Sequence, residues 1–242
     1  MSGHSKWNNI KRKKEKTDAA KAQVFTKIGK EMAIAIREGG GDPNNNSKLR
    51  ELIAKAKANN VPNENIERCI KKFSGNNDIQ YEEITYEGYG PGGVAVIVKT
   101  ATDNRNRTAA NIRSYFSKYH GNMGQTGCVG FLFESKGQII IFDEDDEIDE
   151  DKLMETAMEA GAVDLQSGDH VFEIYTETDD VEFVAEELRK AGYSPESAER
   201  AEIPTTYTKL TSEDDCKYMD LLLSRLEEDD DVQEVFHNWE QE

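Results

Sequence analysis

Hydrophobic side chains in the first third of the chain recur at helical spacing. They predict amphipathic helices at residues 18–38, 47–58 and 63–73, with Asp18 as the N-cap of the first. A run of glycines ends the first helix, and Pro62 precedes the third. Three amphipathic helices joined by short links predict a small helical bundle.

Beyond residue 80 the pattern alternates between short strands and short helices. Helices are predicted at residues 103–120, with Asp103 as the N-cap, and at 149–160, 180–191 and 212–226. Strands are predicted at residues 84–87, 94–100, 129–133, 138–142, 171–176, 197–203 and 232–238. This alternation is typical of α+β domains.

Together these elements predict a multidomain fold of the α and α+β classes. We expect a flexible basic arm at residues 1–16 and a three-helix bundle at 17–76. An α+β domain is expected at 77–136 plus 205–242, and a second α+β domain at 137–204. The second domain would therefore be inserted in the first.

Charge divides the chain more sharply than hydropathy does. The net charge is −18, which taken alone argues against nucleic-acid binding. Residues 1–72, however, carry 17 lysines and arginines against 8 acids, whereas residues 73–242 carry 13 against 40. A sign change of this size predicts a polyanion-binding module on a body that polyanions avoid.

Neither a membrane segment nor a disulfide framework is predicted. The N-terminus lacks the apolar stretch of a secretory signal, and the longest aliphatic runs, 94–98 and 139–142, are too short to span a bilayer. We therefore expect a cytoplasmic protein with no membrane partner. Cys69, Cys128 and Cys216 are far apart and odd in number, which favours small buried thiols.

The main functional prediction is a nucleic-acid-binding surface at the N-terminus. Mobile cations release counterions when they meet phosphates, and an indole can stack on an exposed base. The candidates are cations and a tryptophan of the arm, with three lysines of the first helix: Lys6, Trp7, Lys11, Arg12, Lys13, Lys14, Lys16, Lys21, Lys27 and Lys30. A solvated tail is the alternative, and the segregation of positive charge favours binding.

Two arginines near the start of the helix predicted at 103–120 are secondary candidates. Arg105 and Arg107 lie close to free backbone amides at a helix N-terminus, an arrangement that binds phosphate in other proteins. Two exposed arginines beside an N-cap explain the same residues equally well. Both interpretations stay open at this point.

Other motifs point away from an enzyme. Glycines 88, 90 and 93 match the letters of a dinucleotide fingerprint, but a strand follows where the fingerprint needs a helix, so a hairpin turn is predicted. The acidic run 143–151 lacks the glycine that a calcium loop needs at its sixth position. The histidines lack metal-ligand spacing, and no nucleophile elbow or phosphate loop occurs. We expect no catalytic residue, cofactor, metal or small-molecule substrate.

Four stretches together resemble the YebC/PmpR family. They are residues 2–7 (Ser-Gly-His-Ser-Lys-Trp), 16–27, 86–94 (Tyr-Glu-Gly-Tyr-Gly-Pro-Gly-Gly-Val) and 102–108 (Thr-Asp-Asn-Arg-Asn-Arg-Thr). The resemblance spans the chain and implies a helical bundle followed by two α+β domains, one ferredoxin-like and inserted in the other. It also implies a non-enzymatic role in gene expression.

The resemblance leaves the bound polymer open. Members are described as DNA-binding transcriptional regulators, a mitochondrial relative activates translation of cytochrome oxidase, and bacterial members are linked to ribosomes stalled on proline-rich sequences. One hypothesis is therefore a DNA-binding transcriptional regulator. A second is a ribosome-associated RNA-binding translation factor that relieves stalling, whose acidic domains face basic ribosomal proteins; the charge asymmetry fits it slightly better. A third is a protein–protein adaptor with a solvated tail.

Overall fold

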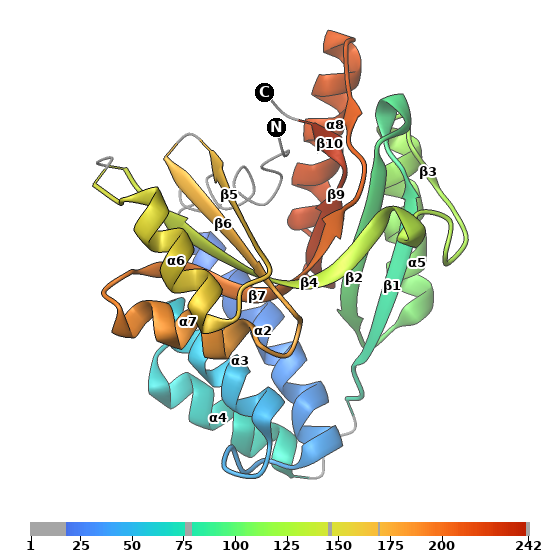
Figure 1. The fold of residues 1–242 in the computed structure, drawn as a ribbon. Coiled ribbons are helices and arrows are strands. Elements are labelled where there is room, and N and C mark those ends of the chain that lie inside the picture. The colour runs from blue at the N-terminus through green and yellow to red at the C-terminus, as the bar shows by residue number, and fades with distance from the viewer. Residues whose placement is uncertain (1–17, 76–78, 145–146, 169, 241–242) are drawn as a thin grey trace. The chain divides into compact units, whose positions relative to one another are not determined.

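The structure is a computed structural model that describes residues 18–75, 79–144, 147–168 and 170–240, with side chains from residue 23 onward (Figure 1). These residues form two compact units. The first, here called the bundle-and-sheet unit, comprises 18–129 and 210–235. The second, here called the acidic unit, comprises 130–209 and 236–240. The sequence placed the inserted domain at 137–204, inside the first of these segments.

Three helices open the bundle-and-sheet unit: α2 (Asp18–Gly39), α3 (Ser47–Ala58) and α4 (Asn63–Ser74). Each agrees with its predicted helix to within one residue at either end. Asn46 caps α3, since its side chain accepts a hydrogen bond from the Leu49 amide. The same side chain donates to the carbonyl of Ala35, so it ties the end of α2 to the start of α3.

A four-stranded sheet of order β3-β1-β2-β9 completes this unit. Its strands are β1 (Glu82–Tyr89), β2 (Ala95–Thr102), β3 (Asn122–Met123) and β9 (Val232–His237); its helices are α5 (Arg105–Lys118) and α8 (Glu213–Glu227), with the short 3-10 turn η1 (Pro91–Gly93). β1 and β2 form an antiparallel hairpin. This confirms the prediction that the glycines between them form a hairpin turn and not a dinucleotide-binding loop. α5 packs against β1, and α8 packs against α5 (Figure 1).

The N-terminus of α5 differs from the prediction in one residue. Asn104, and not Asp103, is the N-cap, because the Asn104 side chain accepts a hydrogen bond from the Arg107 amide. The Asp103 carboxylate instead accepts from the guanidinium of Arg107.

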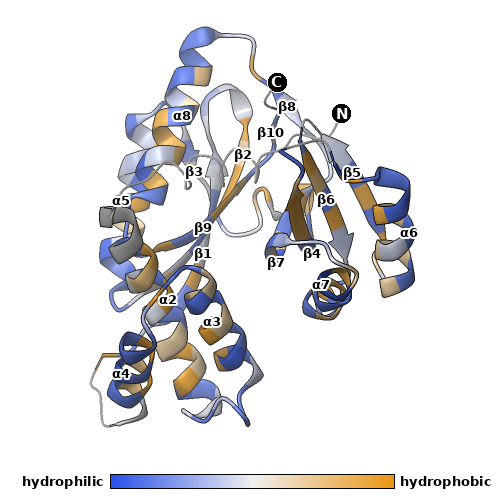
Figure 2. Ribbon diagram, turned by 90° about the vertical axis from the view of Figure 1, so that its left-hand side faces the viewer, coloured by the Kyte–Doolittle hydropathy of each residue, from blue (hydrophilic) through white to orange (hydrophobic). Residues whose placement is uncertain are grey.

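The acidic unit contains a second sheet, of order β5-β6-β4-β7, in which all neighbouring strands are antiparallel. Its elements are η2 (Gly130–Leu132), β4 (Phe133–Phe142), α6 (Glu150–Ala160), β5 (Asp164–Gly168), β6 (Val171–Thr176), α7 (Val181–Lys190), β7 (Pro195–Pro204), β8 (Thr208–Lys209) and β10 (Trp239–Glu240). α6 and α7 bury one face of this sheet around Ile139, Ile174 and Leu188. Figure 2 shows hydrophobic residues in β4 and β6 and hydrophilic ones along α6.

One predicted strand of the acidic unit is wrong, and one strand was not predicted. The strand predicted at 129–133 is mainly the turn η2, whose Phe131 is 72% exposed, and β4 begins only at Phe133. β4 then continues through polar residues whose composition is typical of a loop. They form a strand because pairing with β7 satisfies their backbone groups. β5 was not predicted at all, since four of its five residues are polar or glycine and pairing with β6 holds it in place.

The broad class, a three-helix region followed by an α+β region with antiparallel sheets, is confirmed. Cys69 is buried as expected, whereas Cys128 and Cys216 are partly exposed, and all three are free thiols. Among the helices in the described ranges, none combines the length and apolar character needed to cross a bilayer.

Candidate nucleic-acid interface

Most of the candidate nucleic-acid-binding residues lie outside the described residues: Lys6, Trp7, Lys11, Arg12, Lys13, Lys14 and Lys16. Lys21 lies in α2, but its side chain also falls outside the description. These residues remain predictions. The structure places the side chains of the other four candidates, Lys27, Lys30, Arg105 and Arg107.

Helix α2 is buried on two sides, not one. Its first apolar side, which includes Met32 and Ala35, packs in the core of the bundle. Ala33 and Ile34 are 7% and 2% exposed but lie outside that core, and Lys30 on the same side is only 9% exposed. Because the sequence indicated a single apolar face, it placed the lysines of the other face in solvent.

The second side of α2 binds the end of α8 and the acidic turn at residues 227–231. Lys27 Nζ donates to the carbonyl of Glu227 at 2.7 Å, and Lys30 Nζ donates to the carbonyl of Asp230 at 2.8 Å. Gln23 reaches the carbonyl of Glu228 at 2.8 Å. Cations are favoured at these C-terminal carbonyls, which have no partner inside their own helix. Lys27 and Lys30 thus differ from the exposed, mobile cations that were expected.

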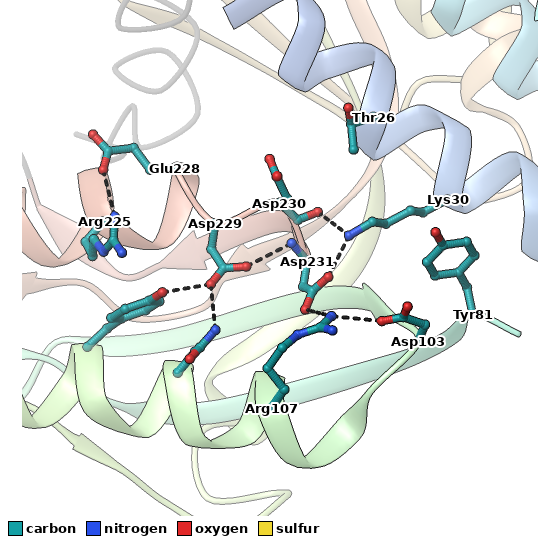
Figure 3. A pocket seen from close by; sticks show the side chains of 12 residues that line it. Thr26, Lys30, Tyr81, Asp103, Arg107, Arg225, Glu228, Asp229, Asp230 and Asp231 are labelled. Carbon is teal, nitrogen blue, oxygen red and sulfur yellow. Dashed lines mark hydrogen bonds and ion pairs between the residues drawn. The ribbon is translucent and has the colours of Figure 1, made fainter. Parts of the chain in front are cut away.

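Asp231 is the centre of this network, and it is 5% exposed. Its carboxylate accepts from Lys30 at 2.6 Å and from Arg107 at 2.8 Å (Figure 3). It also accepts from the Thr108 hydroxyl at 2.8 Å. Burial alone would raise the pKa of Asp231. Hydrogen bonds from Arg107, Lys30 and Thr108 outweigh burial and lower the pKa to about 2. Asp231 therefore stays ionised and holds α2, α5 and β9 together.

A cleft of about 410 Å³ opens beside Asp231. Its lining is almost entirely polar: Thr26, Lys30, Tyr81, Asp103, Arg107, Asn111, Tyr115, Arg225, Glu228, Asp229, Asp230 and Asp231 (Figure 3). Five carboxylates face three cations, so the walls repel phosphate. The Tyr115 hydroxyl donates to Asp229 at 2.8 Å, and the guanidinium of Arg225 lies 4.9 Å from the Tyr115 ring centre. The cleft is a poor site for a polyanion.

The structure separates the two secondary candidates. The guanidinium of Arg107 binds Asp231 at 2.8 Å and Asp103 at 2.9 Å, and these hydrogen bonds raise its pKa. Arg105, by contrast, is exposed, and no carboxylate among the described residues pairs with it. Arg107 therefore has a structural partner, whereas Arg105 stays available to an external anion.

The glycine-rich stretch 86–94 serves the fold. The buried carboxylate of Glu87 accepts from the amides of Gly127 at 2.7 Å and Val129 at 2.8 Å. A Cβ on Gly88 would lie 2.6 Å from the carbonyl oxygen of Asn122, so only glycine fits there. These contacts account for the stretch without a bound nucleic acid.

Helices α3 and α4 carry further exposed cations that the sequence analysis did not single out. Lys57 and Lys71 are exposed, and no carboxylate in the described part of the chain pairs with either. The buried residues of the same helices, among them Leu49, Ala56 and Ile66, lie at other positions of the helical repeat. Helical periodicity was sufficient to place Lys57 and Lys71 on the outer surface of the bundle.

No metal or cofactor site emerges from the ranges that the structure describes. Within them, no three His, Cys, Asp or Glu side chains group as metal ligands would. His120 instead stacks on Tyr218, with ring centres 4.0 Å apart.

Comparison with known families matches almost the whole chain. Residues 5–76 match the TACO1/YebC protein N-terminal domain, and residues 81–239 match the TACO1/YebC second and third domain. A crystal structure of the conserved hypothetical protein Aq1575 from Aquifex aeolicus is similar with a TM-score of 0.84 and 44% identity. That similarity covers 93% of this chain and 92% of the other.

Similar sequences agree with these matches. A protein of Lachnoclostridium phytofermentans is 53% identical over 242 residues, 100% of both chains. A protein of Geobacillus kaustophilus is 54% identical over 239 residues, which cover 98% of this chain and 97% of that one. Both are named probable transcriptional regulatory proteins. The chain thus belongs to the TACO1/YebC family, whose members are non-enzymatic regulators.

Proposed function

We propose that this protein is a DNA-binding transcriptional regulator. In this proposal the N-terminal arm and the outer surface of α3 and α4 contact the phosphate backbone. The arm supplies Lys6, Lys11, Arg12, Lys13, Lys14 and Lys16 as cations and Trp7 as a stacking ring, with Lys21 at the start of α2. Lys57 and Lys71 continue the positive surface on the bundle.

The observation that carries this proposal is the separation of charge. Residues 1–72 have a net charge of +9, whereas residues 130–209 contain 23 acids and 6 lysines and arginines. A polyanion is attracted to the basic residues and repelled by the acidic unit, so we expect contact through the basic residues. The names of the relatives add a role in transcription.

We also infer that the acidic unit is ferredoxin-like. Its order β4-α6-β5-β6-α7-β7, with sheet order β5-β6-β4-β7, matches that motif. RNA-binding sheets of similar build present aromatic side chains on an open face of the sheet. Here the sheet face opposite α6 and α7 carries the buried Glu173, which accepts from Gln138 and Tyr175 at 2.7 Å. A buried carboxylate disfavours a nucleic acid at this place.

The test is the salt dependence of binding to a 30-base-pair DNA duplex. If four to six phosphates are neutralised, log affinity falls with log salt at a slope of roughly −4 to −5. Alanine at Lys11, Arg12, Lys13 and Lys14 together should abolish most binding and flatten that slope. Unchanged affinity in this variant would contradict the proposal.

The control variant removes two lysines from the acidic unit, Lys152→Ala with Lys190→Ala. Both lysines lie in local ion pairs with carboxylates of their own helices or caps. Since they lie far from the basic end in the sequence and on acidic helices, we expect their loss to leave the slope unchanged. Trp7→Ala should weaken binding without changing the slope, because stacking releases no counterion.

RNA on the ribosome is the second candidate, and the same charge separation supports it. The acidic unit would then face basic ribosomal proteins while the arm contacts RNA. Sedimentation with ribosomes through sucrose, with and without residues 1–16, separates the two candidates. Co-sedimentation that needs the arm favours the ribosome, and a protein that stays in the supernatant at low salt favours free DNA.

A further inference from the structure

Helix α5 carries two rows of polar side chains on different sides. Arg107, Asn111 and Tyr115 form one row, at spacings of four residues, and bind Asp229 or Asp231. Arg105 and Arg113 form the other row, which is offset by two residues or about 200° around the helix axis. The acidic turn therefore occupies one row and leaves the second row outside its network.

The second row holds two arginines without an internal counterion. Arg105 and Arg113 are exposed, and in the described ranges neither has a carboxylate partner. The chain holds 48 acids against 30 lysines and arginines, so a guanidinium without a carboxylate partner is unexpected. Some cations of the same unit do have such a partner: Lys48 pairs with Glu83, and Arg68 pairs with Glu64.

Tyr86, on β1, lies beside the start of α5. Its hydroxyl is 3.4 Å from the carbonyl oxygen of Arg105. Burial raises the pKa of Tyr86, the positive charges of Arg105 and Arg113 act to lower it, and the negative charges of Glu82 and Asp231 act to raise it. Arg105, Arg113 and Tyr86 are here called the α5 cluster, and Glu82 is the carboxylate whose charge acts most strongly on Tyr86.

The cluster lies at an edge of the sheet. β3 pairs with β1 only at Gly88 and Tyr89, so residues 82–86 have no strand beside them on that side among the described residues. Arg105 and Arg113 are eight residues apart, a rise of about 12 Å along the helix. That distance corresponds to roughly three to four nucleotides of one strand.

We infer that Arg105 and Arg113, with Tyr86 beside Arg105, bind the phosphodiester backbone of the nucleic acid that the arm and bundle contact. The inference rests on the proposed function and adds a second contact to it. Each guanidinium binds phosphate oxygens through paired N–H groups, which a lysine cannot reproduce. Arg107 takes no part, because Asp231 and Asp103 already engage it.

The test measures fluorescence anisotropy of labelled 30-mers, as duplex DNA, single-stranded DNA and single-stranded RNA, from 50 to 200 mM KCl. For Arg105→Ala with Arg113→Ala we expect about tenfold weaker binding at 100 mM KCl. The salt slope should become shallower by roughly 1.8 on the duplex or 1.4 on a single strand. The polymer with the larger loss is the one that the cluster contacts.

Two further variants make the test specific. Replacement of both arginines by lysine should keep the salt slope and still weaken binding, because charge remains and paired contacts are lost. Glu82→Gln should strengthen binding, since it removes a negative charge that acts on Tyr86. Lys152→Ala with Lys190→Ala changes the net charge equally and should have no effect.

The outcomes separate this inference from the proposed function. If the unaltered protein binds none of the three polymers, the proposed function fails. If it binds and the double alanine variant keeps its affinity and slope, only the α5 contact is overturned. An equal loss in the Lys152 and Lys190 control would also overturn it, because the effect would then be one of net charge. Thermal melts by circular dichroism establish that each variant is folded.

Discussion

At the scale of single residues, one carboxylate explains several side chains that resemble a ligand site. Thr102, Arg107 and Thr108 all donate to Asp231, which lies more than 120 positions away in the sequence. The stretch 102–108 therefore binds an anion, as its composition suggests, but that anion belongs to the protein itself. Of its two arginines, only Arg105 has no carboxylate partner among the described residues.

Replacing Asp231 by alanine should destabilise the fold strongly. The change leaves Lys30, which is 9% exposed, without its partner, and breaking a buried pair costs roughly 3–5 kcal/mol. Asp103→Ala removes only an exposed partner of Arg107 and should cost at most about 1 kcal/mol. Urea denaturation compares the two, and equal losses would show that Asp231 is not the centre of the network.

The same carboxylate predicts a pH dependence. The pKa of Asp231 is about 2 in the folded protein and about 3.9 in an unfolded chain. Because folding lowers this pKa, its stabilisation is complete above about pH 4 and is lost as the pH falls toward 2. At pH 6 the unaltered protein should have a higher unfolding free energy than Asp231→Asn. This difference should be smaller by roughly 1 kcal/mol at pH 3. A constant difference would contradict the lowered pKa.

At the scale of elements, α2 shows how one helix serves two partners. One side builds the bundle core with α3 and α4, and the other side packs Ala33 and Ile34 and directs Lys27 and Lys30 to the end of α8. A helix buried on two sides has few positions left for an external ligand.

This arrangement predicts that Lys27 stabilises the fold and does not bind phosphate. Lys27→Ala should lower the unfolding free energy by about 0.3–1 kcal/mol, since it removes a cation from the C-terminus of α8. The salt slope of nucleic-acid binding should stay unchanged. A slope shallower by about 1 would instead identify Lys27 as a phosphate ligand.

Two glycines should respond to alanine in opposite directions. Gly88→Ala places a methyl group 2.6 Å from the carbonyl oxygen of Asn122 and 2.9 Å from the ring of Phe116, and should cost roughly 1–3 kcal/mol. Gly29→Ala, inside α2, meets only the sulfur of Cys69 at 3.8 Å and should stabilise the helix by up to about 1 kcal/mol. Chemical denaturation measures both, and a destabilised Gly29→Ala would contradict the spacing in α2.

At the scale of the whole molecule, positive and negative charge are concentrated in different parts of the chain. Residues 1–72 and residues 130–209 differ in the sign of their net charge, and residues 130–209 alone hold 23 of the 48 acids. A field of this kind acts over distance and is screened by salt, so it affects the rate of encounter more than the stability of the complex.

Neutralising part of the acidic unit should therefore speed association at low salt only. Glu150, Glu155 and Glu159 of α6, changed together to glutamine, should raise the association rate with DNA several-fold in 10 mM salt, where the screening length is about 30 Å. At 150 mM salt the rate should match that of the unaltered protein. Stopped-flow fluorescence at both salt concentrations measures it, and an equal gain at high salt would point to a direct contact instead.

The sequence by itself determined what depends on local physics. The three helices of the bundle follow from apolar positions at helical spacing and from glycine and proline at their ends, and the limits match to within a residue. The β1–β2 hairpin follows from its glycine-rich turn, and the two-signed charge can be counted directly.

The tertiary structure decided what depends on partners remote in the chain. β5 and the first half of β4 are polar and form strands because β6 and β7 pair with them. From the sequence, Lys30 and Arg107 resemble free cations, but in the folded chain both pair with Asp231. Arg105 and Arg113 lie outside that network. Periodicity records which side of an element is apolar, whereas the partner of a charged side chain is set by distances that exist only in the folded chain.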